Sequence, residues 1–144
     1  MGVRVFATVS QQKKTATFLA RLFSLLEVSN ISVDVYYVSD VRMQELYKRT
    51  AGKDKITNVL AFPQPKYFID PDAGESYLGE IYLAQSYIKK EAKEMNIKLD
   101  IWESRLLIHG VLHLLGFDHI KKGDATRMEK KETKIFKTMG IQLP

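Results

Sequence analysis

Three histidines carry the clearest chemistry in this sequence, and all of them lie within residues 109–119. His109 and His113 are four residues apart. On an α-helix, four residues turn by about 400° and rise by about 6 Å, so both imidazoles lie on one face. Gly116 can end such a helix, because glycine tolerates a left-handed backbone, and the chain can then return His119 to the same point. Three nitrogen ligands and one open position are typical of a catalytic zinc site.

Two other interpretations of these histidines stay open. A single histidine on an apolar helix is more often a hydrogen-bonded core residue than a metal ligand. A structural zinc site would need a fourth protein ligand and, because the chain has no cysteine, a carboxylate such as Asp118 or Glu80 would have to supply it. Three histidines with this spacing, in a chain with no other histidine, favour the catalytic site.

The spacing matches the metalloprotease pattern H-E-x-x-H-x-x-G-x-x-H at every metal position. One residue departs from it, because Gly110 stands where the proteases carry the glutamate that acts as general base. Without that carboxylate, a zinc-activated water beside a peptide bond lacks its usual proton acceptor. The pattern therefore favours a hydrolase of another substrate, or one whose base comes from elsewhere.

Three stretches of the chain resemble the YbeY family, the single-domain, metal-dependent endoribonucleases of ribosomal RNA maturation. The most specific is HGVLHLLGFDH at 109–119. GKDKITNVLAFP at 52–63 is similar to the family's G-K-D-x-x-T-[DN]-V-L-[ST]-F-P, and LGEI at 78–81 is similar to its L-G-D-I. The family commonly has an arginine directly before G-K-D, where this chain has Ala51, with Arg49 two residues earlier. The resemblance covers essentially the whole chain.

The resemblance implies a metal-dependent, single-strand-specific endoribonuclease that acts in ribosomal RNA maturation and processing. One Zn²⁺ per chain would be held by His109, His113 and His119. Zinc would lower the pKa of a bound water from ~15.7 towards ~7 and polarise a phosphoryl oxygen. The expected partners are RNA, in particular ribosomal RNA, and the ribosome or its proteins, with no DNA.

Four further residues are candidates for the same site. Asp118 can orient a zinc-bound histidine, since such a histidine usually donates its other N–H to a carboxylate or carbonyl, although a turn residue would look the same. Lys53 and Lys55 can bind phosphates. Arg49 can take the role of the family's missing arginine, as a phosphate ligand or as a cation that stabilises the transition state. Asn58 enters only through the resemblance.

Composition limits the possible fold and function less closely than the motifs do. The chain has 144 residues, of which 45% are hydrophobic and 27% are charged, which predicts one globular domain over residues 1–144. We expect no signal peptide and no membrane span, because no apolar run is long enough. The absence of cysteine fits a cytoplasmic protein. The net charge of +5 weakly favours a polyanionic partner such as RNA.

Two other functions remain open. A zinc metallopeptidase would need a carboxylate base in place of Gly110, and Glu80 is the candidate that the motifs offer. A non-catalytic RNA- or ribosome-binding factor would use zinc only for stability.

Hydrophobic periodicity predicts one α+β domain with a mixed four-stranded sheet and about five helices. The likeness of the histidine pattern to that of the metalloproteases implies a zincin-like arrangement around the histidine helix. A strand, a helix and a strand open the chain and imply a parallel pair with a right-handed crossover. Two later strands joined by a loop imply an antiparallel pair. The expected strands are 3–9, 31–38, 59–62 and 78–84, and the expected helices are 15–28, 40–49, 85–96, one capped by Asp100 that carries His109 and His113, and 123–139.

Overall fold

The framework of the protein is one mixed β-sheet. The computed structural model describes residues 2–64, 69–70, 75–117 and 122–141. Four strands follow the order β1-β2-β5-β3, in which β1 and β5 run parallel to β2 and β3 runs antiparallel to β5. A two-residue strand, β4, also pairs with β5. The strands are β1 (Gly2–Phe6), β2 (Ile31–Val38), β3 (Val59–Pro63), β4 (Ile69–Asp70) and β5 (Glu75–Ala84).

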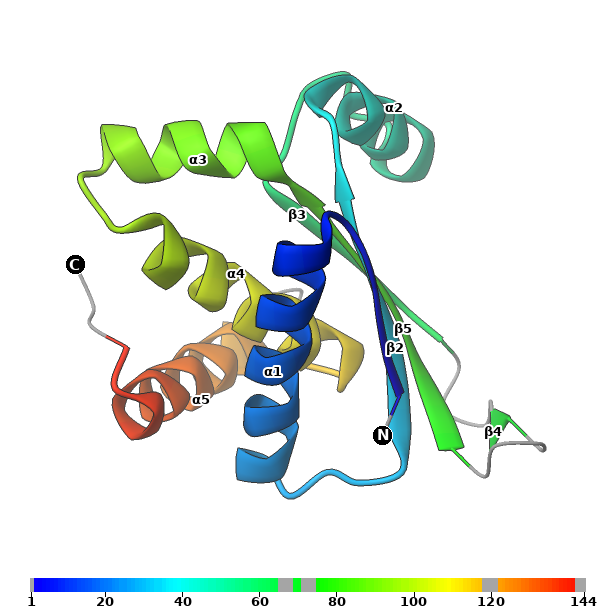
Figure 1. Cartoon of the computed structure of the whole chain (residues 1–144), viewed down its shortest axis with the longest axis vertical. Coiled ribbons are helices and arrows are strands. Elements are labelled where there is room, and N and C mark those ends of the chain that lie inside the picture. The colour runs from blue at the N-terminus through cyan, green and yellow to red at the C-terminus, as the bar shows by residue number, and fades with distance from the viewer. Residues whose placement is uncertain (1, 65–68, 71–74, 118–121, 142–144) are drawn as a thin grey trace.

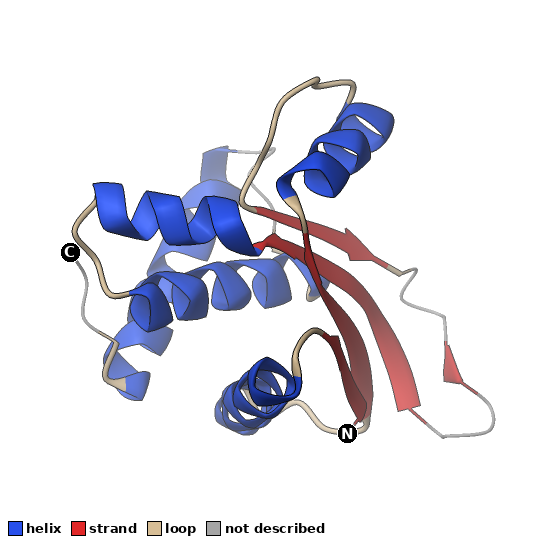
Figure 2. Ribbon diagram, turned by 45° about the horizontal axis from the view of Figure 1, so that its top comes forward, coloured by secondary structure: helices blue, strands red, loops and turns tan. Residues whose placement is uncertain are grey.

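The helices other than α2 lie on one side of this sheet, and α2 lies beside one end of it (Figures 1 and 2). None of the helices in the described part of the chain is long and apolar enough to cross a membrane. The helices are α1 (Val9–Leu25), α2 (Asp40–Ala51), α3 (Gln85–Glu94), α4 (Leu99–Leu114) and α5 (Lys122–Met139).

The core forms between the sheet and the helices. Alternate residues of β2 and β5, among them Val33, Val35 and Ile81, are fully buried, because successive strand side chains point to opposite faces. Helix α4 is buried on nearly every side, as its apolar sequence predicts, whereas α1 and α5 each bury a single stripe. The packing places α4 in the interior and makes it a rigid support for its two histidines.

The predicted fold class is confirmed, with an α+β arrangement, a mixed sheet and five helices. Two helix starts were wrong. Lys98 is the N-cap of α4, and Asp100 lies in the first turn. Its carboxylate interacts favourably with the helix dipole there and pairs with Lys14 at 2.5 Å. Helix α1 begins at Val9 and not at residue 15, and the prediction missed its first turns because they are mostly polar and carry no apolar periodicity.

Gly79 explains the L-G-E-I stretch. Its φ is +135°, and a Cβ at this position would collide with the Phe62 carbonyl oxygen of the neighbouring strand β3. The pairing of β5 with β2 shifts register just before it, as in a β-bulge. After this shift, Ile81 points towards the helices, so Glu80 must point to the opposite face of the sheet.

Candidate active site

His109 and His113 converge at the C-terminal half of α4. Their Nε2 atoms are 3.2 Å apart, and the ring planes meet at 71°. This is the arrangement that the four-residue spacing predicts. The helix ends just beyond them, where Gly116 has a φ of +102° and the Phe117 amide donates to the Leu112 carbonyl at 2.9 Å. The predicted role of Gly116 as the end of the helix is therefore confirmed.

Glu132 of α5 fixes the orientation of His109. The Nδ1 atom of His109 lies 2.7 Å from the Glu132 carboxylate, and the Glu132 side chain is 19% exposed. An ionised carboxylate only accepts hydrogen bonds, so Nδ1 is the donor. In a neutral imidazole this leaves the Nε2 lone pair facing His113, which is the state that a metal ligand requires.

The two described histidines fit a metal ion. Nitrogens bound to zinc at 2.0–2.1 Å and at a tetrahedral angle lie roughly 3.3 Å apart, close to the separation seen here. His119 and Asp118, the expected third ligand and the candidate orienting carboxylate, lie outside the described residues. Within the described ranges, no three potential ligands gather at a metal-binding distance, so the ligand set as a whole stays a prediction.

A pocket of about 360 Å³ opens beside His109. Helix α4, helix α5 and the start of β3 form its walls. Asn58 donates to Glu91 at 3.1 Å, and the Trp102 indole N–H donates to the same carboxylate at 3.2 Å, so the GKDKITNV stretch is tied to α3 and α4 here. The described lining residues are Thr57, Asn58, Val59, Trp102, Arg105, Leu106, His109, Glu132 and Phe136.

The three cations proposed from the sequence lie elsewhere. Arg49 is exposed in the last turn of α2, and Lys53 and Lys55 are exposed in the loop that follows. The Lys53 ammonium lies 5.9 Å from the Tyr47 ring centroid. None of the three is among the described residues that line the pocket beside His109. Their roles in catalysis and phosphate binding therefore stay predictions.

The two positions that could carry the base of a peptidase, Gly110 and Glu80, are not available for that role. A Cβ on Gly110 would lie 3.3 Å from two side-chain carbons of Ile81, so this position packs directly on β5. Glu80 is on the other face of the sheet, where its carboxylate accepts from the Tyr82 hydroxyl at 2.6 Å. The sheet therefore separates Glu80 from the histidines, and its candidacy as a base or a fourth ligand was wrong.

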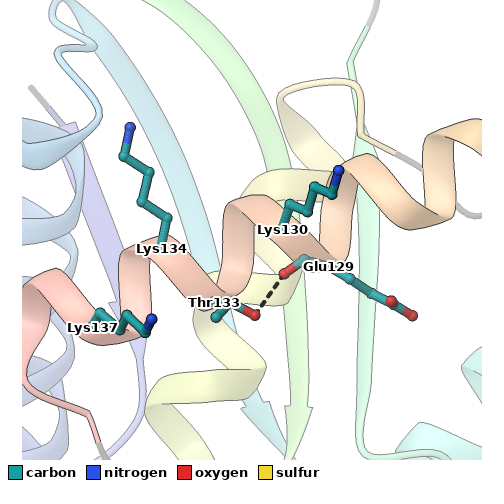
Figure 3. Close-up of a pocket in the computed structure, with 5 residues that line it drawn as sticks. All are labelled: Glu129, Lys130, Thr133, Lys134 and Lys137. Carbon is teal, nitrogen blue, oxygen red and sulfur yellow. Dashed lines mark hydrogen bonds between the residues drawn. The ribbon is translucent and has the colours of Figure 1, made fainter.

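A second, shallow pocket lies on the exposed side of α5 (Figure 3). Its described lining comes from one helix, and the long side chains spread apart instead of converging on a point. The Thr133 hydroxyl donates to the Glu129 carbonyl at 2.9 Å, a bond within the helix. This face carries three lysines, Lys130, Lys134 and Lys137, and is typical of a solvated helix surface.

Sequence reasoning missed Glu132 and Arg105. Both are charged residues at positions where the helical pattern is otherwise apolar. Glu132 lies on the same stripe of α5 as the buried Met128, Ile135 and Phe136. A carboxylate inside an apolar stripe must find a partner when it is buried, which is the signal that could have identified it.

A buried helix that presents two converging imidazoles beside a polar pocket is an arrangement typical of metal-dependent hydrolases. Comparisons with known proteins narrow this class to one family. The family described as "Endoribonuclease YbeY" matches residues 4–140. An endoribonuclease YbeY of Francisella philomiragia is 37% identical over 131 residues, which are 88% of this chain and 83% of the relative.

Two further similarities agree with this match. An endoribonuclease YbeY of Sulfurihydrogenibium sp. is 36% identical over 126 residues, which are 85% of this chain and 80% of the relative. The solution structure of TM1509 from Thermotoga maritima has the same fold, with a TM-score of 0.60, 24% identity, and coverage of 95% of this chain and 91% of that one. The chain belongs to the YbeY endoribonuclease family, so the predictions of this family and of a hydrolase acting on RNA are confirmed.

Proposed function

We propose that this endoribonuclease is zinc-dependent, prefers single-stranded RNA and acts in ribosomal RNA maturation in the cytoplasm. The observation that supports zinc is the 3.2 Å separation of the two Nε2 atoms on a buried helix, with Glu132 holding the outer nitrogen of His109. His119 would complete the ligand set, one zinc ion would bind per chain, and the ribosome or its proteins would present the substrate.

A zinc ion held there would supply Lewis-acid chemistry and activate a water. The residues of the chain do the remaining work. Glu132 keeps the His109 ring in one orientation and one tautomer, so the site needs little reorganisation before the reaction. The lining of the pocket beside His109 includes Asn58 and Trp102, and this pocket would receive the RNA strand.

Metal analysis combined with two cleavage assays tests this proposal. We expect about one zinc per chain, cleavage of a single-stranded RNA that a chelator abolishes, and no cleavage of casein. A double-stranded RNA of the same sequence serves as the matched control for strand preference. Chelator-sensitive cleavage of casein, with both RNAs intact, would contradict the proposal, and so would RNA cleavage that persists after complete removal of metal.

A further inference from the structure

Arg105 is a half-buried cation in the pocket beside His109. Its guanidinium carbon lies 5.5 Å from the Trp102 ring centroid and 5.1 Å from the Phe136 ring centroid. Both distances are within the range of a cation–π contact. Contact with two aromatic rings restrains the guanidinium group and leaves its in-plane N–H donors to bind elsewhere.

The donors of Arg105 are not used by the rest of the described chain. Its Nε is buried and has no hydrogen-bond partner among the described residues. The two neighbouring carboxylates are engaged otherwise, since Glu91 accepts from Trp102 and Asn58, and Glu132 bonds to His109. Buried charges and buried N–H groups are normally paired, so an unpaired guanidinium in a pocket indicates an anion that binds there.

We propose that Arg105 binds a phosphate of the RNA in this pocket. The inference rests on the endoribonuclease function and adds a residue to it. Arg105 lies four residues before His109, so about 6 Å along the helix separates the two positions on one face of α4. A planar guanidinium matches a phosphate with two parallel hydrogen bonds, and it places the neighbouring phosphodiester next to the histidine pair.

Trp102 gives a direct measurement, because it is the only tryptophan in the chain and it contacts the Arg105 guanidinium. We expect inorganic phosphate, added to the full-length protein at constant ionic strength, to change the tryptophan emission in a saturable way. Arg105→Gln should weaken this response at least about tenfold, the usual loss for a hydrogen bond to a charged group. Arg21→Gln, on the exposed side of α1, is the matched control and should behave like the wild type.

RNA binding gives a second measurement that does not depend on cleavage. With a chelator present to stop the reaction, Arg105→Gln should reduce the slope of log affinity against log salt for a single-stranded oligoribonucleotide by roughly 0.7. Arg105→Lys keeps the charge but loses the planar fork, so we expect several-fold weaker phosphate binding with an unchanged melting temperature.

Three results would overturn the proposal. They are a wild-type emission that does not respond to phosphate, equal binding by Arg105→Gln and Arg21→Gln, and an Arg105→Lys protein that binds phosphate like the wild type. If Arg105→Gln does not fold, the wild-type titration and Arg105→Lys still decide the question. Phosphate and RNA binding through Arg105 without any cleavage of RNA would contradict the endoribonuclease function alone.

Discussion

Two glutamates, the buried Glu103 and the partly buried Glu132, show how differently this protein uses a carboxylate. Glu103, in the first half of α4, accepts hydrogen bonds from Gln11 at 2.7 Å and from the Tyr37 hydroxyl at 2.6 Å. Thr15 lies 2.7 Å from the same hydroxyl, so α1, β2 and α4 share one closed network. Glu132 instead bonds to His109, whose other nitrogen faces His113.

The comparison separates a structural role from a functional one. The Glu103 network borders a cavity of only about 70 Å³, and its donors and acceptors satisfy one another. Burial, together with the Glu103 carboxylate, raises the pKa of Tyr37 well above its ordinary value of 10, so its hydroxyl remains a donor above the pH at which an exposed tyrosine ionises. The Glu132 cluster opens to a pocket of about 360 Å³ and contains a cation whose buried Nε has no partner among the described residues. Polar groups that satisfy one another's hydrogen bonds stabilise the fold, whereas polar groups without a partner are available for a ligand.

The largest expected effect concerns metal binding by the histidine pair next to Glu132. His113→Ala removes one of the two converging nitrogens, so we expect bound metal to fall from about one ion per chain to a trace. Elemental analysis after dialysis against metal-free buffer measures this, and circular dichroism checks that the fold persists. Stoichiometric metal in the variant would refute the assignment of His113 as a ligand.

A change in the Glu103 network should lower the stability of the protein. Glu103→Ala removes the charged acceptor of the Tyr37 hydroxyl and the Gln11 amide in a buried place, and we expect a loss of about 2–3 kcal/mol in the free energy of unfolding. Urea denaturation measures it, with the exposed Glu129→Ala as control. Metal affinity should stay at the wild-type value, and a variant that loses metal while keeping its stability would reverse the two roles.

Glu132→Gln should instead lower the metal affinity and leave the stability nearly unchanged. The amide keeps the size of the side chain but weakens the hold on His109 Nδ1, and changes to such supporting groups lower metal affinity by about 10–100-fold. Competition with a chromogenic chelator measures the affinity, and urea denaturation should show little change. If Glu132→Gln binds metal like the wild type, the contact with His109 has only a packing role.

These roles differ in how well a sequence can predict them. The pairing of His109 with His113 depends on helical spacing alone, and the end of α4 depends on Gly116, so both follow from local sequence. The contact between His109 and Glu132 joins residues 23 apart in the chain and exists only because α5 packs on α4. Similarly, Phe136 of α5 contacts Arg105, and this contact also exists only because the two helices pack together. Contacts that depend on the packing of separate elements could not be read from periodicity.

The smallest expected effects concern the cations that the sequence favoured. Arg49, Lys53 and Lys55 are exposed and outside the described lining of the pocket, so we expect them to act on binding and not on the cleavage step. Each single change to glutamine should weaken affinity equally for every RNA sequence and reduce the salt slope by roughly 0.7 if that residue contacts one phosphate. The cleavage rate at saturating RNA should not change, because a contact formed equally in the ground and transition states does not alter that rate. Measuring rate and affinity side by side at two salt concentrations tests this difference. A cleavage rate that falls more than affinity for Arg49→Gln would return Arg49 to the catalytic site and show that α2 reaches the substrate during the reaction.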